Sequence, residues 1–218
     1  MRHALALILC LTAATAARAC DTALVLAIDI SGSVDAGEYA LQTQGLALAL
    51  MDGAVAEALV RGQVAVTVVQ WSGVGAQAVV LPWQRMTDPG AVAALAREAA
   101  TLPRAFDASD TAVGEAIAFS ARQFDAVPDC RRRVIDISGD GDENAGFTVG
   151  RERAAAQRAG IEINAIAIEE MGASVPVTQF YLRWGITRGG FVVTARGLID
   201  YPRAMREKLL RELTKPAA

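Results

Sequence analysis

Short apolar runs rich in β-branched residues alternate along the chain with longer stretches of helical periodicity. The first run, Thr22 to Asp29, ends at a polar turn and is typical of a strand buried on both faces of a parallel sheet. The predicted strands are Thr22–Asp29, Gln63–Trp71, Gln77–Trp83, Arg133–Ser138, Ile161–Ile168 and Gly190–Thr194. The predicted helices are Asp35–Gly62, Pro89–Ala100, Thr111–Phe124, Val149–Ala159, Val177–Trp184 and Leu198–Leu213. This order predicts an α/β fold, in which helices cover both faces of a doubly wound, mainly parallel sheet of six strands.

One pair of strands departs from the parallel pattern. Only the short link Ser72 to Gly75 separates the second predicted strand from the third. A link this short joins antiparallel strands, because a parallel crossover needs a dozen or more residues. We therefore expect one antiparallel strand at the edge of the sheet.

The first nineteen residues have the features of a secretory signal peptide. Arg2 and His3 lead into the apolar run 4–11, and Ala17-Arg18-Ala19 fits a small-x-small cleavage pattern. We therefore expect residues 1–19 to be removed and the mature protein to be exported, to the periplasm or the extracellular medium. Cys20 follows the cleavage pattern directly, so a lipid-anchored protein is the alternative, although Arg18 at the cleavage site disfavours it.

Composition narrows the classes of function. The 199 residues after the signal suit one domain, predicted over residues 20–214 with a frayed tail at 215–218. They carry 19 basic and 24 acidic side chains, a net charge of −5, with no dense basic patch, so nucleic acid is not an expected partner. No later apolar run is long enough to cross a membrane, and we expect a monomer without a membrane span.

The expected mature chain has no histidine. The only one, His3, lies in the predicted signal. The mature chain is therefore not expected to contain a Ser-His-Asp triad, a zinc site of the usual kind or a histidine general base. Neither Ser72 nor Ser138 lies in a G-x-S-x-G nucleophile elbow. We therefore expect a protein that is not an enzyme.

Oxygen ligands are concentrated after the first predicted strand. Asp29-Ile30-Ser31-Gly32-Ser33 presents one carboxylate and two hydroxyls within five residues. Such donors suit a hard cation such as Mg²⁺. Capping of the next helix by Ser33 or Asp35 is the alternative, but it accounts for one of these side chains only.

Two further segments complete a recognisable pattern. Ser138-Gly139-Asp140-Gly141 follows a buried strand, and Thr111 precedes a helix that continues Gly-x-Ala-Ile. Together with the D-x-S-x-S segment, they resemble the metal-ion-dependent adhesion site of von Willebrand factor A-type domains. The resemblance covers the order of strands and helices over essentially the whole mature chain.

A narrower resemblance is to a bacterial exported family of A-type domains with an undefined role. The stretches that carry it are Tyr39-Ala40-Leu41-Gln42, Gln70-Trp71-Ser72-Gly73, Ile135 to Gly141 and Lys208 to Glu212. This resemblance implies a fold but not an activity.

The resemblance to A-type domains implies a set of ligands and a partner. Ser31 and Ser33 would bind Mg²⁺ directly, Thr111 directly or through water, and Asp29 and Asp140 mostly through water. Mn²⁺ or Ca²⁺ could replace Mg²⁺. The partner would be a protein that offers an Asp or Glu carboxylate to the ion. A metal-dependent hydrolase and an assembly or chaperone component of a cell-envelope complex remain as alternatives.

The strand order of A-type domains also implies a disulfide. It makes the first and fourth strands neighbours, and Cys20 and Cys130 precede these two strands. The two cysteines would then meet at the sheet edge opposite the metal site.

The remaining acidic residues of these loops have simpler interpretations. We expect Asp136 to be structural, Asp142 and Glu143 to be solvated loop charges, and Asp110 to cap the following helix.

Overall fold

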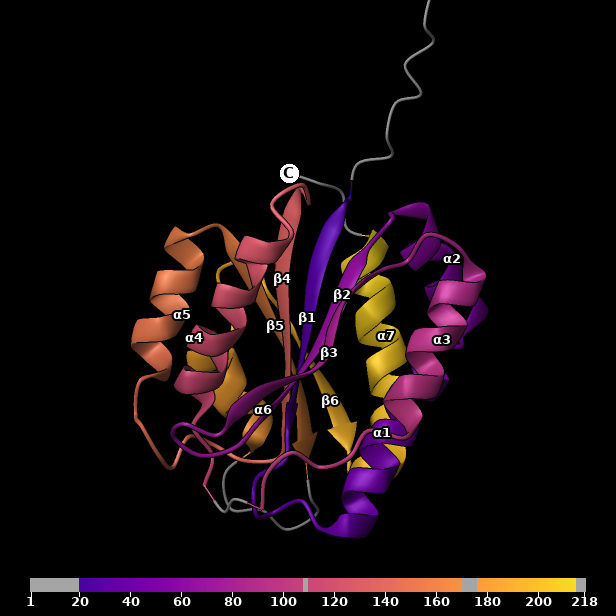
Figure 1. Cartoon of the computed structure of the whole chain (residues 1–218). Helices are drawn as coiled ribbons and strands as arrows, with labels where there is room; N and C mark the ends of the chain where they lie inside the picture. The colour runs from indigo at the N-terminus through magenta and orange to yellow at the C-terminus, as the bar shows by residue number, and fades with distance from the viewer. Residues whose placement is uncertain (1–19, 108–109, 170–175, 215–218) are drawn as a thin grey trace, which may run out of the picture.

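A computed structural model describes residues 20–107, 110–169 and 176–214. The predicted signal peptide and the predicted tail lie outside these residues. Six strands form one sheet in the order β3-β2-β1-β4-β5-β6 (Figure 1), in which only β3 is antiparallel to its neighbour. The strands are β1 (Thr22–Asp29), β2 (Ala65–Trp71), β3 (Gln77–Arg85), β4 (Arg132–Gly139), β5 (Ile161–Glu169) and β6 (Val192–Arg196). The predicted α/β fold, with its antiparallel edge strand, is confirmed.

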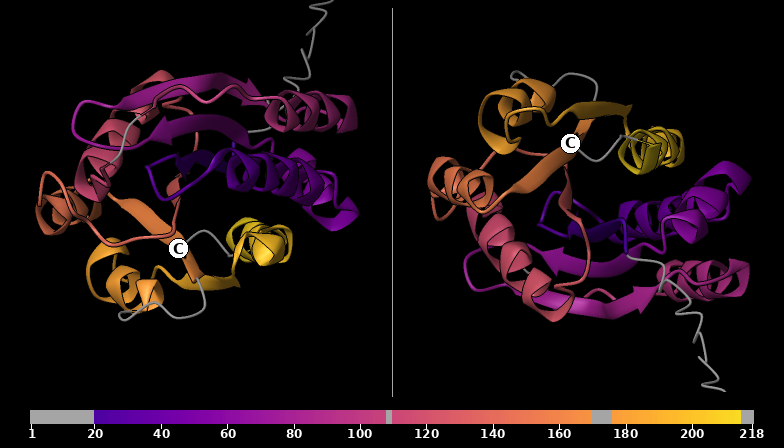
Figure 2. Two further views of the ribbon diagram at one scale, coloured as in Figure 1. Left: turned by 90° about the horizontal axis from the view of Figure 1, so that it is seen from below. Right: turned by 90° about the horizontal axis from the view of Figure 1, so that it is seen from above.

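Helices cover both faces of the sheet (Figure 2). One layer contains α1 (Ala36–Leu50), α2 (Gly53–Arg61), α3 (Pro89–Ala100) and α7 (Tyr201–Thr214). The other contains α4 (Val113–Gln123), α5 (Val149–Arg158) and α6 (Val177–Phe180). Each layer buries its own apolar cluster against the sheet, which explains why strands such as β1 are apolar on both faces.

The helix predicted from Asp35 to Gly62 is two helices, so that prediction was wrong. The break falls at Met51 and Asp52, where the Asp52 carboxylate accepts hydrogen bonds from the backbone N–H groups of Ala54 and Val55, at 3.1 and 3.2 Å. Asp52 therefore caps a new helix. Among the described residues no single helix is long and apolar enough to cross a membrane; α1 and α2 reach that length together but are bent by 66°.

A disulfide joins the two cysteines that the resemblance paired. Cys20 and Cys130 are bonded immediately before β1 and β4. Both strands end at the opposite edge of the sheet, which faces downward in Figure 1. The predicted disulfide is confirmed.

A buried group of three charges connects α7 to the middle of the sheet. Lys208 of α7 places its Nζ 2.6 Å from a carboxylate oxygen of Asp136 on β4 and 2.6 Å from one of Glu212 on α7. All three side chains are at most 1% exposed. Asn164 on β5 donates a further hydrogen bond to Glu212 at 2.8 Å. Asp136 thus has the structural role expected for it.

Candidate metal centre

A chain of hydrogen bonds links four of the five predicted metal ligands at the carboxyl edge of the sheet. At the end of β1, Oδ1 of Asp29 accepts from the Ser31 backbone N–H at 2.8 Å. The Ser31 and Ser33 hydroxyl oxygens are 3.2 Å apart, and the Ser33 hydroxyl donates to Oδ1 of Asp140 at 2.8 Å. The loops after β1 and β4 therefore bring two carboxylates and two hydroxyls together, as adjacent parallel strands predict.

The fifth predicted ligand, Thr111, lies beside this series of hydrogen bonds and is not part of it. Its backbone N–H donates to the Asn144 side chain at 2.8 Å. The Ser72 hydroxyl donates to the backbone carbonyl of Asp110, the residue before Thr111, at 2.8 Å. The Thr111 hydroxyl oxygen is 4.0 Å from the point that a Cβ would occupy at Gly141. The start of α4 is thereby held against the turn that follows Asp140.

The electrostatics of the two carboxylates favour a bound cation. Asp29 is fully buried, and burial together with the charge of Asp140 raises its pKa to about 8. Burial also raises the pKa of Asp140, and Glu38 raises it further. Oδ2 of Asp29 is buried and has no hydrogen-bond partner among the described residues. Such an oxygen needs a donor or a cation, so the residues fit a hard metal ion.

Hydroxyls are essential to this interpretation of the site. The described part of the chain contains no group of three or more His, Cys, Asp or Glu side chains placed to hold a metal. Two carboxylates supplemented by Ser and Thr oxygens give an oxygen-only donor set, which suits Mg²⁺, Mn²⁺ or Ca²⁺. That these five residues bind a metal stays a prediction.

Arg104 supports the loop from below, and sequence reasoning missed it. Its guanidinium donates to the backbone carbonyls of Ile30 at 2.7 Å, Ser31 at 2.9 Å and Val34 at 2.7 Å. The segment around Arg104 is itself held by Gln70, whose side chain accepts from the Ala105 N–H at 2.7 Å. No local sequence motif predicts that an arginine will bind backbone carbonyls at least 70 residues away in sequence.

Glu143 is a bridge between two helices, so its interpretation as a solvated loop charge was wrong. Its carboxylate accepts from the backbone N–H groups of Gly114 at 2.8 Å and Val149 at 3.1 Å, at the starts of α4 and α5. Helix N-termini favour such an acidic partner. The N-cap of α4 is Ala112, without a side-chain cap, so the expected capping role of Asp110 was also wrong.

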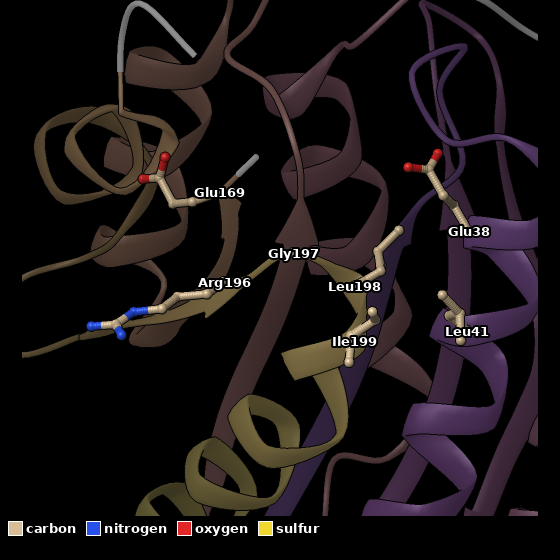
Figure 3. A pocket seen from close by; sticks show the side chains of 7 residues that line it. All are labelled: Glu38, Leu41, Glu169, Arg196, Gly197, Leu198 and Ile199. Carbon is tan, nitrogen blue, oxygen red and sulfur yellow. The ribbon is translucent and has the colours of Figure 1, made fainter. Parts of the chain in front are cut away.

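A groove opens at the same edge of the sheet, between the start of α1 and the ends of β5 and β6 (Figure 3). It has a volume of 420 Å³ and is lined by Glu38, Leu41, Glu169, Arg196, Gly197, Leu198 and Ile199. Ile199 is 87% exposed. Glu38 lines the groove, and its charge raises the pKa of Asp140. The groove and the candidate metal centre thus share one edge of the sheet, and a charge in the groove acts on Asp140.

In the comparison with protein families, residues 19–217 match the family described as "Protein of unknown function (DUF1194)". The comparison with curated proteins gave no match.

Solved structures show what the fold resembles. A von Willebrand factor type A protein from Catenulispora acidiphila is 19% identical with a TM-score of 0.66, over 90% of this chain and 43% of that one. Proximal thread matrix protein 1 from the mussel byssus, with a zinc-occupied MIDAS motif, is 13% identical with a TM-score of 0.64, over 89% and 46%. The pilus adhesin SpaC from Lactobacillus rhamnosus GG is 13% identical with a TM-score of 0.65, over 88% and 30%.

This chain therefore spans less than half the length of these matched proteins. At such identities the likeness shows the fold alone, which is that of a von Willebrand factor A-type domain.

Proposed function

Because this chain belongs to the DUF1194 family and has the fold of a von Willebrand factor A-type domain, we propose that it is an exported, metal-dependent protein-binding module. It captures an Asp or Glu carboxylate of a protein partner through a bound Mg²⁺ ion. The observation that carries this proposal is the buried Oδ2 of Asp29, which lacks a partner among the described residues and lies next to the hydrogen-bonded Ser31, Ser33 and Asp140.

Each residue has a role in holding the ion. Ser31 and Ser33 bind it through their hydroxyls, Thr111 directly or through water, and Asp29 and Asp140 through water. Because few ligands bring a charge into direct contact, the ion stays attractive to one more carboxylate, which the partner supplies. Mn²⁺ and Ca²⁺ would satisfy the same oxygen ligands. The groove beside Glu38 offers room for the residues that flank the partner's carboxylate.

Export and a binding role support each other. The Cys20–Cys130 disulfide persists in oxidising compartments, which agrees with the predicted signal peptide at 1–19 and with the periplasm or extracellular medium. The adhesin and the byssus matrix protein that share the fold support a protein-interaction module. We propose a monomer. We also propose that it has no catalytic activity, since the only histidine, His3, lies in the predicted signal.

A pull-down from the cell-envelope fraction of the producing organism tests this function. The mature protein is used as bait with Mg²⁺, with EDTA, and as the Asp29→Ala variant. Asp125→Ala is the matched control, because Asp125 is exposed and follows the C-terminus of α4, whereas the candidate centre lies at the N-terminus of that helix. We expect one partner to be retained by the wild type and by Asp125→Ala in Mg²⁺ only. Equal retention in EDTA and by Asp29→Ala would show that a metal does not hold the partner.

A further inference from the structure

Two buried polar atoms without a hydrogen-bond partner among the described residues border one point behind the candidate metal centre. They are Oδ2 of Asp29 and the Tyr181 hydroxyl. A Cβ at Gly139 would collide with the Tyr181 hydroxyl, and it would lie 3.0 Å from Oδ2 of Asp29 and 3.5 Å from Cζ2 of Trp71. The missing side chain of Gly139 thus leaves a space that the Tyr181 hydroxyl and Oδ2 of Asp29 both border.

The backbone around Tyr181 is shaped to deliver its ring to this point. Tyr181 begins the π-helical turn Tyr181–Gly185 that follows α6, and its side chain is fully buried. A Cβ at Gly185 would lie 2.6 Å from Cδ1 of the ring, so only glycine fits there without displacing Tyr181. Single π-helical turns occur frequently at functional sites. Two glycines, one on β4 and one in the turn, therefore make room for one buried tyrosine.

The chemistry of these groups is complementary. A carboxylate only accepts hydrogen bonds, and Oδ1 of Asp29 already accepts one from Ser31. Burial and the charges of Asp29 and Asp140 raise the pKa of Tyr181 well above its ordinary value, so the hydroxyl keeps its proton. An O–H donor and an oxygen able to accept from it thus border the same buried space.

We propose that Tyr181 is a positioning residue of the metal centre. Neither the Tyr181 hydroxyl nor Oδ2 of Asp29 has a hydrogen-bond partner among the described residues. When the cation binds, the hydroxyl donates to Oδ2 of Asp29 and holds this carboxylate in the orientation that serves the ion. This inference rests on the proposed function, because it assumes that Asp29 serves a metal ion. Residues that orient metal ligands in this way commonly change metal affinity by about 10- to 100-fold when they are replaced.

The test is Tyr181→Phe, which removes the hydroxyl and keeps the ring that packs under the sheet. Mg²⁺ affinity is measured by calorimetry and Mn²⁺ affinity by electron paramagnetic resonance, on the mature protein with its disulfide intact. We expect affinity about 10- to 100-fold below that of the wild type. The matched control is Tyr201→Phe, because Tyr201 is equally buried but directs its hydroxyl to Ser138 at 3.4 Å. We expect the control to bind metal as the wild type does.

A second variant, Gly139→Ala, keeps the hydroxyl but displaces it and also crowds Oδ2 of Asp29, so it should weaken metal binding too. Thermal unfolding of each variant separates loss of fold from loss of affinity. Wild-type affinity in folded Tyr181→Phe would overturn the inference and leave the proposed function standing. A lower unfolding temperature with unchanged affinity would show that Tyr181 only packs, and would overturn it as well. A wild type that binds neither ion would instead refute the proposed function.

Discussion

The buried charges at α7 make a specific prediction about pH. Lys208 offers one positive charge to two carboxylates, those of Asp136 and Glu212, in a site from which water is excluded. One ammonium balances one carboxylate, so the site favours a proton on the other. Burial accordingly raises the pKa of Asp136, and burial followed by the charge of Asp136 raises that of Glu212 to about 7, against the attraction of Lys208.

The sign of the effect follows from where the proton is bound. Between the ordinary pKa of glutamate, 4.5, and about 7, folded Glu212 holds a proton that the unfolded chain releases. The stabilisation is therefore complete below pH 4.5 and is lost as the pH rises through 7. A shift of this size corresponds to about 3 kcal/mol in the free energy of unfolding.

Glu212→Gln removes the titration while keeping an oxygen that can accept from Lys208. Guanidinium unfolding at pH 4.5 and at pH 7.5 measures the free energy of unfolding of each protein. We expect the wild type to lose about 3 kcal/mol more than the variant between the two pH values. The comparison cancels the raised pKa of Asp29, which acts in the same direction in both proteins.

Glu207→Gln is the matched control, because Glu207 is an exposed residue of the same helix, paired with Arg203. It should leave the pH dependence unchanged. Equal pH dependence in the wild type and in Glu212→Gln would refute the reasoning, since it would mean that both buried carboxylates stay ionised beside one lysine.

The disulfide and the support of the metal loop give two further predictions. Replacing both Cys20 and Cys130 with Ala should lower the free energy of unfolding by up to about 5 kcal/mol, because the bond closes a loop between residues 110 apart in sequence. Guanidinium unfolding checks this, and Mg²⁺ affinity should not change, because the bond lies at the opposite edge; a loss of affinity would contradict that separation. Arg104→Met should weaken Mg²⁺ binding in calorimetry by freeing the carbonyls of Ile30, Ser31 and Val34, with Arg104→Lys intermediate. Unchanged affinity in Arg104→Met would show that the loop needs no such support.

The parts of the fold that local patterns determine were predictable. Buried strands, the antiparallel β2–β3 pair and the oxygen-rich loops after β1 and β4 each follow from a few adjacent residues. The break between α1 and α2 was missed because the apolar helical pattern continues on both sides of Asp52. The Asp52 side chain nevertheless interrupts the helix there, because it accepts hydrogen bonds from the backbone N–H groups of Ala54 and Val55.

The residues that surround the site were harder to predict, for a different reason. Arg104, Glu143 and Tyr181 act on segments far from them in sequence, through backbone carbonyls, helix N-termini and a glycine-lined space. None of them belongs to a spaced motif, and each acquires its role only when the sheet brings the loops together. Sequence patterns therefore indicated the candidate ligands but not the groups that orient them.

The most direct test of the account is a calorimetric titration of the mature, metal-free protein with Mg²⁺, alongside Asp29→Ala and the Asp125→Ala control. The account predicts one ion bound per chain in the wild type and in Asp125→Ala, and strongly weakened or absent binding in Asp29→Ala. Absence of binding in the wild type, or equal binding in Asp29→Ala, would contradict the claim that the loops after β1 and β4 form a metal centre.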